Sequence, residues 1–435
     1  MLDFLRRIYL GLIAPPTVPK SDSTLRFGLL GASKIAPQCL ITPAKSHPEV
    51  MIVAVAARDR AKAQEYANRY NIPIVHGSYD ALLNDPSISC VYIALPNSLH
   101  YEWALRAIHA GKHVLLEKPS VSNSIEARLL FNHPLVTSPK SPVLLEAFHY
   151  RFHPAWQTFL SLIHDDQLAG PVQNVDCQTY MWKGFLEQDD IRLKYSLSGG
   201  CMMDFATYNL SFIRDVLKDP HPQVISATFR VRSQQDSKRE GPGEDQIDEA
   251  VTASFKSRSG ANAQLVADMV KTGGWPLLPS SWTETWPSAG WPKCVVQLGE
   301  VQVDASPADE GHMHYVQRTV TLWNLVFLHL YHTIEVKDKH RLISKHSHEV
   351  RSWTVAKTIK SYNWPNKTKG RPGEDWWSTY RFQLEEFVNR VKGRAGSGVW
   401  VESADSIAQM EIIDEVYRKG GLDIRSTSSF RLDDR

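Results

Sequence analysis

Short apolar segments that alternate with stretches of helical spacing occupy the first 150 residues and restrict the folds open to this chain. Runs this short and this apolar indicate strands buried on both faces, and the helical stretches between them supply the crossovers that parallel strands need. The pattern predicts an α/β unit with a doubly wound parallel sheet. The expected strands are LRFGLLG (25–31), MIVAVA (51–56), CVYIAL (90–95), HVLLE (113–117) and VLLEAF (143–148).

The pattern changes after residue 150, and 435 residues are too many for one ordinary core. Longer segments alternate apolar and polar residues, which is typical of antiparallel strands with one solvated face. They include VISATFRVR (224–232), AVTASFKS (250–257) and VVQLGEVQVDA (295–305), and helical spacing returns at 376–391 and 403–418.

These changes predict two domains. We expect an N-terminal extension over 1–24, a dinucleotide-binding Rossmann domain over 25–148 and an α+β domain over 149–435. A Trp- and Pro-rich insertion at about 271–293 has no period and is expected to form an ordered loop or lid, and the polar tail after Gly421 is expected to be frayed.

Charge and cysteine content narrow the function classes. Because 49 lysines and arginines nearly balance 47 aspartates and glutamates, there is no strong field to attract nucleic acid or an anionic membrane. Five scattered cysteines without CxxC spacing favour a reducing, cytoplasmic location and argue against zinc. His312 and His314 form an HxH pair, but no further cysteine or carboxylate cluster completes a metal site, so we predict none.

The N-terminal segment MLDFLRRIYLGLIAPP is short for a signal-peptide core and too short to span a bilayer. It is either a helix packed on the body or a weak membrane-surface helix. We expect no stable membrane insertion.

The first expected strand runs into Gly28-Leu29-Leu30-Gly31-Ala32-Ser33-Lys34-Ile35-Ala36. This stretch fits a G-x-G-x-x-A dinucleotide fingerprint in which Ser33 replaces the second glycine. Gly31 would make the tight turn, and Ala36 would allow close helix packing. The second strand ends at Ala57-Arg58, where an NAD enzyme normally carries an acidic residue. Arg58 favours NADP over NAD because its guanidinium can pair with a 2′-phosphate.

An ordered set of motifs resembles the glucose-fructose oxidoreductase/inositol dehydrogenase/rhizopine-catabolism (Gfo/Idh/MocA) family of NAD(P) enzymes. The resemblance is nearest to the dihydrodiol dehydrogenase and NADP-dependent D-xylose 1-dehydrogenase branch. It implies a Rossmann domain followed by a domain with a large open, mostly antiparallel sheet, and a homodimer. The motifs are Leu95-Pro96-Asn97 with His100, Glu117-Lys118-Pro119, the run from Glu146 to Pro154 that includes Tyr150 and Arg151, and Gly199-Gly200-Cys201-Met202-Met203-Asp204.

The resemblance also implies the site. The lysine of the EKP motif is catalytic in the family and matches Lys118, and its partners match Asp204 and Tyr208, which share one helix face at four-residue spacing. We predict Tyr208 as the proton acceptor, Lys118 as its activating cation and Asp204 as a hydroxyl-orienting group. The expected cofactor-binding residues are Gly31, Ser33, Lys34, Ile35, Arg58, Leu95, Pro96, Asn97, His100, Glu117 and Lys118, and the expected substrate-binding residues are Tyr150, Arg151, Asp204 and Tyr208.

Together with these residues, the resemblance implies an oxidoreductase that moves a hydride between NADP and a C–OH group of a sugar or cyclic diol, for example D-xylose. Two alternatives stay open: a tailoring oxidoreductase for a larger aromatic or secondary-metabolite substrate, and a non-catalytic NAD(P)-sensing regulator. Glu117 would steady either Lys118 or the nicotinamide ribose. Tryptophans of the insertion would line the substrate pocket or pack on the body or a second subunit; they are Trp275, Trp282, Trp286 and Trp291.

Overall fold

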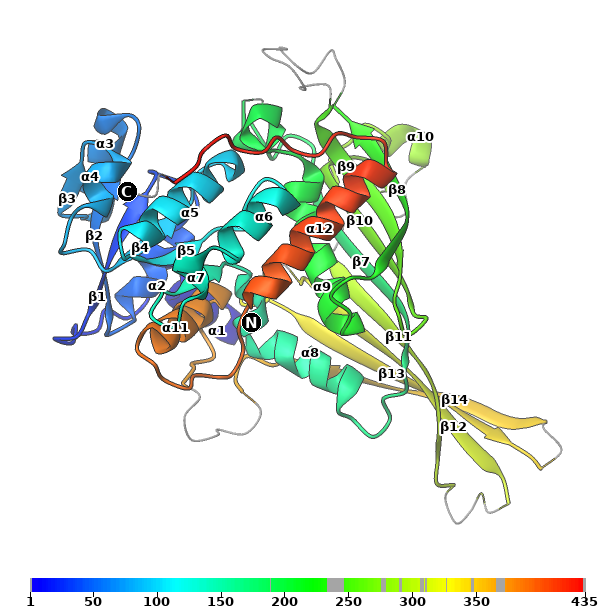
Figure 1. The fold of residues 1–435 in the computed structure, drawn as a ribbon. Helices are drawn as coiled ribbons and strands as arrows, with labels where there is room; N and C mark the ends of the chain where they lie inside the picture. Colours follow the sequence, from blue (N-terminus) through cyan, green and yellow to red (C-terminus); the bar gives the residue numbers. More distant parts are fainter. Residues whose placement is uncertain are drawn as a thin grey trace.

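The computed structural model describes residues 2–432 except 188, 233–245, 275–278, 289–291, 306–308, 310, 326, 346–347 and 365–371. A parallel sheet and a larger, mostly antiparallel sheet lie on opposite sides of a layer of helices (Figure 1). The predicted fold class is therefore confirmed.

All neighbouring strands of the N-terminal sheet are parallel, and their order is β3-β2-β1-β4-β5-β6. The prediction of five strands missed β3, because its three residues are only partly buried and form no distinct apolar run. The strands are β1 (Leu25–Leu30), β2 (Val50–Ala56), β3 (Ile74–His76), β4 (Cys90–Ile93), β5 (His113–Leu116) and β6 (Leu144–Glu146).

Helices connect these strands, and side-chain caps fix where several of them begin. The Asp59 carboxylate accepts from the amides of Ala61 and Lys62 and starts α3, so the chain turns into a helix directly after Arg58. The helices of this half are η2 (Pro37–Ile41), α2 (Thr42–Lys45), α3 (Arg60–Tyr70), α4 (Tyr79–Leu83), η3 (Asn97–Leu99), α5 (His100–His109), α6 (Ser124–Phe131) and α7 (Pro134–Thr137).

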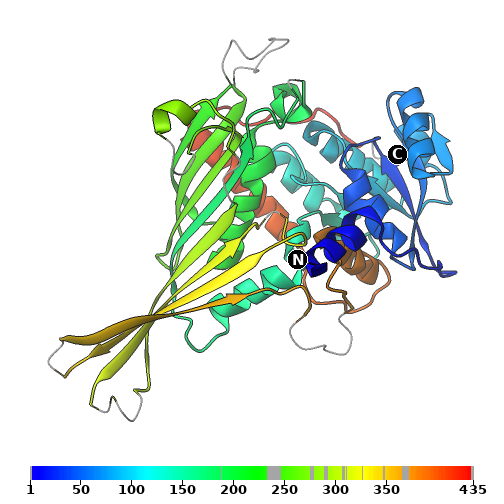
Figure 2. The ribbon, with the colours of Figure 1, turned by 180° about the vertical axis from the view of Figure 1, so that it is seen from behind.

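The second sheet has the order β14-β13-β12-β11-β7-β10-β9-β8, and only the β7–β10 pair is parallel. Helices gather on one of its faces, and the other face is uncovered in the described residues (Figure 2). The strands are β7 (Val172–Trp182), β8 (Gln223–Val231), β9 (Asp248–Lys256), β10 (Asn262–Lys271), β11 (Lys293–Val303), β12 (Met313–Trp323), β13 (Thr333–Ile343) and β14 (Glu349–Ile359).

Two of the covering helices carry or approach the candidate site. Helix α9 (Thr207–Leu217) packs on β7 and β10 of the second sheet. Helix α11 (Thr379–Val391) packs on η2 and α2, the helices that connect β1 to β2 in the parallel sheet. The remaining helices are η4 (His149–Phe152), α8 (Pro154–His164), η5 (Ile191–Leu193), η6 (Tyr195–Leu197), η7 (Met202–Ala206), α10 (Ser280–Thr283) and α12 (Ser403–Lys419).

The Trp-rich insertion is only partly within the described residues. Trp282 lies in α10 and Trp286 follows that helix; both are exposed, whereas Trp275 and Trp291 lie outside the described residues.

The N-terminal helix α1 (Leu2–Ile8), continued by η1 (Tyr9–Ile13), packs on the body. The Arg7 guanidinium lies 3.8 Å from the Tyr362 ring centroid, and Arg6 forms an ion pair with Asp375. Among the described residues, no helix is long and apolar enough to cross a membrane.

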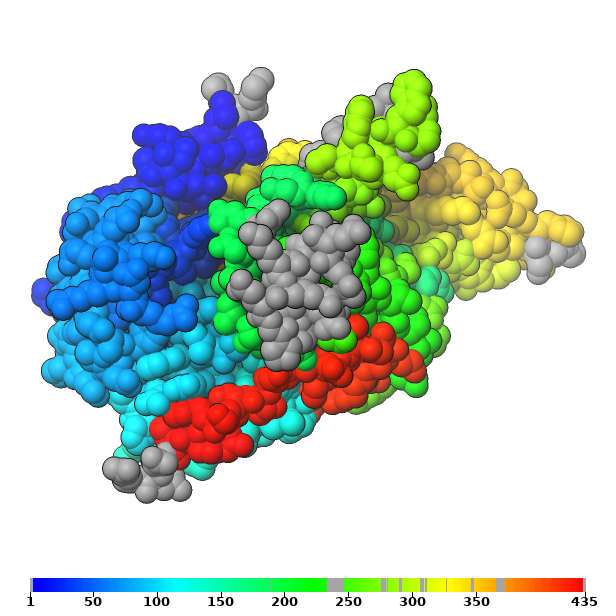
Figure 3. All heavy atoms as spheres, turned by 90° about the horizontal axis from the view of Figure 1, so that it is seen from above, coloured from blue at the N-terminus to red at the C-terminus, as the bar shows by residue number. Residues whose placement is uncertain are grey.

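The polar tail is not frayed, which corrects the expectation. Residues 421–432, here called the C-terminal strap, lie along the surface of the first domain (red in Figures 1 and 3). Arg425 is fully buried, with its guanidinium 2.6 Å from Oδ1 of Asp248, and the Ser428 amide donates to Glu126 over 2.6 Å. The polar composition concealed this because hydrogen bonds and one buried ion pair hold the strap, together with scattered apolar side chains such as Ile424 and Phe430 that pack on the core.

Candidate functional site

Lys118 and Asp204 meet at the carboxyl-end edge of the parallel sheet. Lys118 follows β5, and its Nζ lies 2.6 Å from Oδ1 of Asp204 and 2.9 Å from the Asp204 carbonyl oxygen. Ligands bind at this edge of open α/β sheets because the crevice opens there. The structure therefore brings the predicted lysine and aspartate together from different halves of the chain.

The second oxygen of Asp204 is held by an arginine that the sequence analysis missed. Arg192 in η5 donates from Nε to Oδ2 over 2.6 Å. Although burial raises it, the charges of Arg192 and Lys118 hold the pKa of Asp204 well below its usual range. The Asp204 carboxylate is thus held between two cations, and no sequence motif had marked Arg192 as one of them.

Tyr208 lies in the same cluster, but not as expected. The Lys118 ammonium lies 4.6 Å from the Tyr208 ring centroid, whereas the Tyr208 hydroxyl is 3.1 Å from Nε2 of His149. Burial, followed by the charges of Glu117 and Asp204, raises the pKa of Tyr208 well above its usual value. The cation therefore contacts the ring face, and a histidine holds the hydroxyl.

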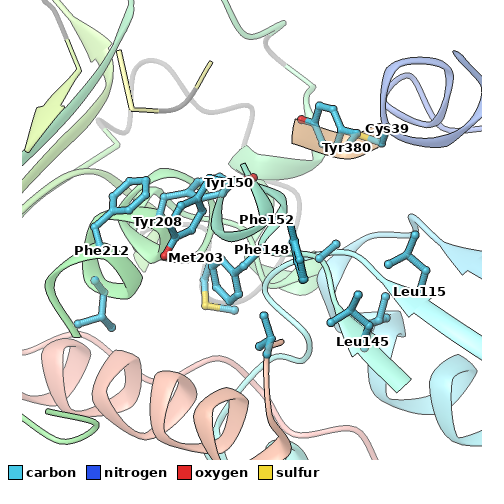
Figure 4. Packing of buried hydrophobic residues seen from close by; sticks show 14 of the residues in the cluster. Cys39, Leu115, Leu145, Phe148, Tyr150, Phe152, Met203, Tyr208, Phe212 and Tyr380 are labelled. Atoms are coloured by element: carbon cyan, nitrogen blue, oxygen red, sulfur yellow. The ribbon is translucent and has the colours of Figure 1, made fainter. Parts of the chain in front are cut away.

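Aromatic packing fixes the tyrosine ring. Tyr208 lies among Phe148, Tyr150 and Phe212 (Figure 4), with ring centroids 6.0, 6.2 and 6.5 Å away. The orientation of its hydroxyl is therefore set by the core.

Glu117 contacts the strand end that carries Lys118 and a tyrosine of the neighbouring strand. Its Oε1 accepts from the Tyr92 hydroxyl over 2.6 Å, and its Oε2 is 3.3 Å from the Lys118 backbone nitrogen. Burial raises the pKa of Glu117. The carboxylate therefore steadies the strand end that carries Lys118.

The glycine loop has the geometry that a dinucleotide needs. Gly31 has φ +99°, and a Cβ there would come within 3.0 Å of Leu95 Cδ2. Ser33 accepts at Oγ from the Ala36 amide, which opens the following helical segment. Arg58 is exposed after β2, where its side chain is available to a phosphate. These residues fit an NAD(P) cofactor.

Other expected cofactor residues surround this loop. Lys34 forms an exposed ion pair with Glu187, 2.9 Å apart, and Ile35 is half-buried. In the turn that follows β4, Leu95 is buried and Pro96 half-buried, and Asn97 donates to the Ser198 carbonyl over 2.9 Å.

His100 is fully buried below the turn. Its two ring nitrogens each lie 2.9 Å from a backbone carbonyl, of Pro119 and Leu95. Both ring nitrogens are therefore engaged by the backbone of the turn and of the segment after β5.

The structure does not bring Tyr150 and Arg151 to the site through their polar atoms. The Tyr150 hydroxyl donates to Ser211 Oγ over 2.8 Å. Arg151 is paired with Asp215 and Asp405, at 3.0 and 2.5 Å. Their polar groups are engaged by the protein itself and build the support behind Tyr208. Among the described residues there is also no cluster of His, Cys, Asp or Glu that could hold a metal ion.

The parallel sheet, its glycine turn and the lysine after β5 define a Rossmann-type dinucleotide-binding protein. Two family models match the chain: "Oxidoreductase family, NAD-binding Rossmann fold" over residues 25–133, and "GFO/IDH/MocA C-terminal domain" over residues 157–285. The chain belongs to the Gfo/Idh/MocA oxidoreductase family.

Curated relatives agree. D-xylose 1-dehydrogenase (NADP(+)) 2 of Haloferax volcanii is 36% identical over 204 residues, which are 47% of this chain and 61% of that protein. The chain thus spans about 60% of the length of this relative. A dTDP-3,4-didehydro-2,6-dideoxy-alpha-D-glucose 3-reductase of Streptomyces violaceoruber is 31% identical over 258 residues, 59% of this chain and 70% of that protein.

The fold has solved counterparts. A 3-ketoreductase from Actinomadura kijaniata, in complex with NADP and TDP-benzene, has a TM-score of 0.63 at 20% identity and covers 92% of this chain and 99% of its own. At this identity the likeness concerns the fold alone.

Proposed function

We propose that this protein is an NADP-dependent oxidoreductase that transfers a hydride between the nicotinamide and a C–OH group of a sugar or cyclic diol. The observation that carries the proposal is the Lys118–Asp204 contact of 2.6 Å, with Tyr208 packed under the same ammonium. It lies at the sheet edge where the family binds its dinucleotide. An isolated surface ion pair would have no reason to be backed by a second cation and a buried tyrosine.

Bound NADP would supply the hydride acceptor or donor, and Gly31, Ser33 and Arg58 are the residues best placed to hold it. Lys118 is the group that contacts the reacting oxygen. Its ammonium has three donors, of which two are engaged by Asp204, so one remains to bind a substrate hydroxyl or carbonyl oxygen. Asp204 orients the lysine, because its Oδ1 and its carbonyl oxygen both accept from the ammonium.

Tyr208 is the proposed proton carrier. In oxidation it takes the proton of the substrate hydroxyl, and in reduction it returns one to the carbonyl oxygen. Its raised pKa suits proton donation in the state described by the structure. Proton acceptance requires added positive charge nearby, or a second group that receives the tyrosine's own proton.

Relatives support two substrate candidates. D-xylose is our first candidate, since a relative 36% identical over 204 residues carries that name. A second candidate is the reduction of a larger keto-sugar or aromatic substrate, which is favoured by the 31% identical 3-reductase and by exposed Trp282 and Trp286. A cofactor-sensing regulator without turnover is the third.

The test is turnover of NADP and NAD with aldoses and trans-dihydrodiols, and of NADPH and NADH with keto-sugars. We expect NADP-linked turnover, and a loss of about 10²- to 10³-fold in kcat/KM for Lys118→Met. Lys357→Met, on the exposed strand β14, is the matched lysine control. If the protein binds the cofactor but turns over none of these substrates, the result would support the cofactor-sensing regulator.

We further propose a homodimer in the cytoplasm. The family resemblance and the uncovered face of the eight-stranded sheet support the dimer. Five cysteines without a disulfide support the reducing compartment. Sedimentation of the purified protein tests the first proposal, and imaging of the tagged protein tests the second.

A further inference from the structure

The C-terminal strap reaches back to the segment that carries Asp204. It follows α12 and crosses from the second domain to helices α6 and α5 of the first (Figure 1). On its way, the buried guanidinium of Arg425 donates from Nε to the Gly199 carbonyl over 2.8 Å. Gly199 begins a turn, residues 199–201 and here called the 199–201 turn, that leads directly into η7. Because Asp204 belongs to η7, the strap contacts the backbone from which this carboxylate projects.

The same guanidinium also holds the far end of the turn, through Asp248. Its Nη2 lies 2.6 Å from Oδ1 of Asp248, and Oδ2 of Asp248 accepts from the Met202 amide over 2.6 Å. The Tyr417 hydroxyl of α12 donates to Oδ1 over 3.0 Å. Met202 is the first residue of η7, and the first amides of a helix have no acceptor within the helix. Arg425 and Asp248 therefore fix both the carbonyl that enters the turn and the amide that leaves it.

A close backbone approach at Gly200 makes this arrangement sensitive to small shifts. Gly200 has φ +123°, and a Cβ there would collide with Oδ1 of Asp248. Its amide donates to the Arg192 carbonyl over 2.8 Å, and its carbonyl accepts from the Asp204 amide over 3.1 Å. One residue of the turn thus sets the backbones of Arg192 and Asp204, the two residues whose side chains meet beside the lysine.

The first domain holds the strap and the turn from the other side. Nδ2 of Asn123, the residue that caps α6, donates to the Arg425 carbonyl over 2.9 Å. Ser198, which precedes the turn, donates from Oγ to Oγ of Ser122 over 3.0 Å. The backbone of Arg425 is therefore tied to the first domain while its side chain is tied to the second. The proposed site lies between the same two domains.

We propose that Arg425 is a positioning residue of the active site, and that the strap must be docked for Asp204 to hold Lys118 in its working place; this inference rests on the proposed function. Arg425 acts through the 199–201 turn on Asp204, and Asp204 acts through its 2.6 Å contact on the Lys118 ammonium. Without the strap the turn would relax and carry the carboxylate away from the lysine. A displacement of about 1 Å by a change far from the chemistry costs about 10²-fold in rate.

Arg425→Lys tests this with the charge retained. A lysine keeps a cation beside Asp248, but its compact ammonium lacks the planar fork with which the guanidinium engages Asp248 and Gly199 together. We expect kcat to fall by about 10- to 100-fold. The dissociation constant of NADP should stay within about twofold of the wild-type value, because the expected phosphate-binding residues belong to the first domain. Arg431→Lys is the matched control, since this exposed guanidinium donates to carbonyl oxygens of the strap itself. A wild-type kcat in Arg425→Lys would overturn the proposal.

A kinetic double-mutant cycle separates positioning from a general loss of stability. In the Asp204→Asn background, Arg425→Lys should change kcat/KM by less than about twofold, because the group through which Arg425 acts is already impaired. A purely structural effect would be independent of Asp204. The two losses would then multiply in the double variant, and that result would overturn the proposal.

Backbone amide hydrogen exchange tests the same contacts without turnover. In Arg425→Lys, the amides of residues 200–206 should exchange about 10-fold faster than in the wild type, whereas those of β4 should keep their protection, since only the turn is released. Unchanged exchange at 200–206, or an equal acceleration at β4, would overturn the proposal. If the wild type turns over no substrate but exchange in Arg425→Lys rises at 200–206 alone, the proposed function fails while the hold of the strap on the Asp204 segment stands.

Discussion

The ammonium of Lys118 is fixed 2.6 Å from Oδ1 of Asp204, a residue 86 positions further along the chain. The lysine belongs to the parallel sheet and the aspartate to the helical layer of the second domain. The proposed active site therefore forms only when the two halves are docked.

Removing the charge of Asp204 tests this docking directly. Asp204→Asn leaves Lys118 and Arg192 facing an uncharged amide, so the two cations lose the group that orients them. We expect kcat/KM to fall by about 10²-fold, as for loss of one fixed polar group in an active site. Asp190→Asn is the control, because Asp190 pairs with Arg192 but not with Lys118. Equal activity of both variants would contradict the assigned role.

Arg58 is expected to select the cofactor. Its exposed guanidinium follows β2, where a 2′-phosphate would lie, and charge-assisted hydrogen bonds contribute about 1.5–3 kcal/mol. Arg58→Ala should therefore weaken NADP binding by about 10- to 100-fold and leave NAD binding within about twofold. Calorimetric titration with both dinucleotides measures this, with Arg69→Ala as the control on the exposed face of α3. An equal loss for the two cofactors would remove Arg58 from the recognition of the phosphate.

Glu146 should give the protein a characteristic pH dependence. Burial raises the pKa of this carboxyl to about 7, although the Ser406 and Ser120 hydrogen bonds lower it. The folded state then holds a proton that the unfolded state has released, so this group's contribution to stability is lost as pH rises from about 4.3 to about 7.

Glu146→Gln should lack that loss. Thermal unfolding from pH 4 to 8 should show the variant gaining stability relative to the wild type as pH rises, with the difference levelling off above about pH 7. The exposed Glu65→Gln serves as the comparison. A constant difference across the range would show that Glu146 titrates normally.

Arg425 should be a large contributor to stability. Arg425→Met leaves Asp248 as a buried charge without its ion-pair partner, a change that costs about 3–5 kcal/mol. Chemical denaturation measures the free energy of unfolding, and the double variant with Asp248→Asn should recover part of the loss. A loss below about 1 kcal/mol would mean that the pair behaves like an exposed one.

Sequence patterns anticipated the parts of this molecule that depend on local chemistry. The turn at Gly31 was predictable because φ +99° needs glycine, and the convergence of Lys118 and Asp204 was implied by the family resemblance. Strand β3 was missed because three half-buried residues carry no period. The motif did not reveal where the Arg151 side chain points. It forms ion pairs with Asp215 and Asp405 in the interior, away from the predicted substrate position.

The missed residues share a physical reason. Arg192 stands in the single-turn helix η5, and its role arises only from its tertiary contact with Asp204. His149 lies within a motif that the sequence analysis identified, but its bonds to Tyr208 and Thr379 join three elements. Contacts between separate elements produce no repeating pattern in the sequence, so they are seen only in the folded structure.

The C-terminal strap also bears on how the protein is made. Glu126 accepts a hydrogen bond from the amide of Ser428, 302 positions downstream. Asn123 likewise donates to the carbonyl oxygen of Arg425. At a translation rate of roughly 5–20 residues per second, Glu126 and Asn123 are synthesised roughly 15–60 s before their hydrogen-bond partners in the strap. Docking of the strap on α6 is therefore a late event of biosynthesis.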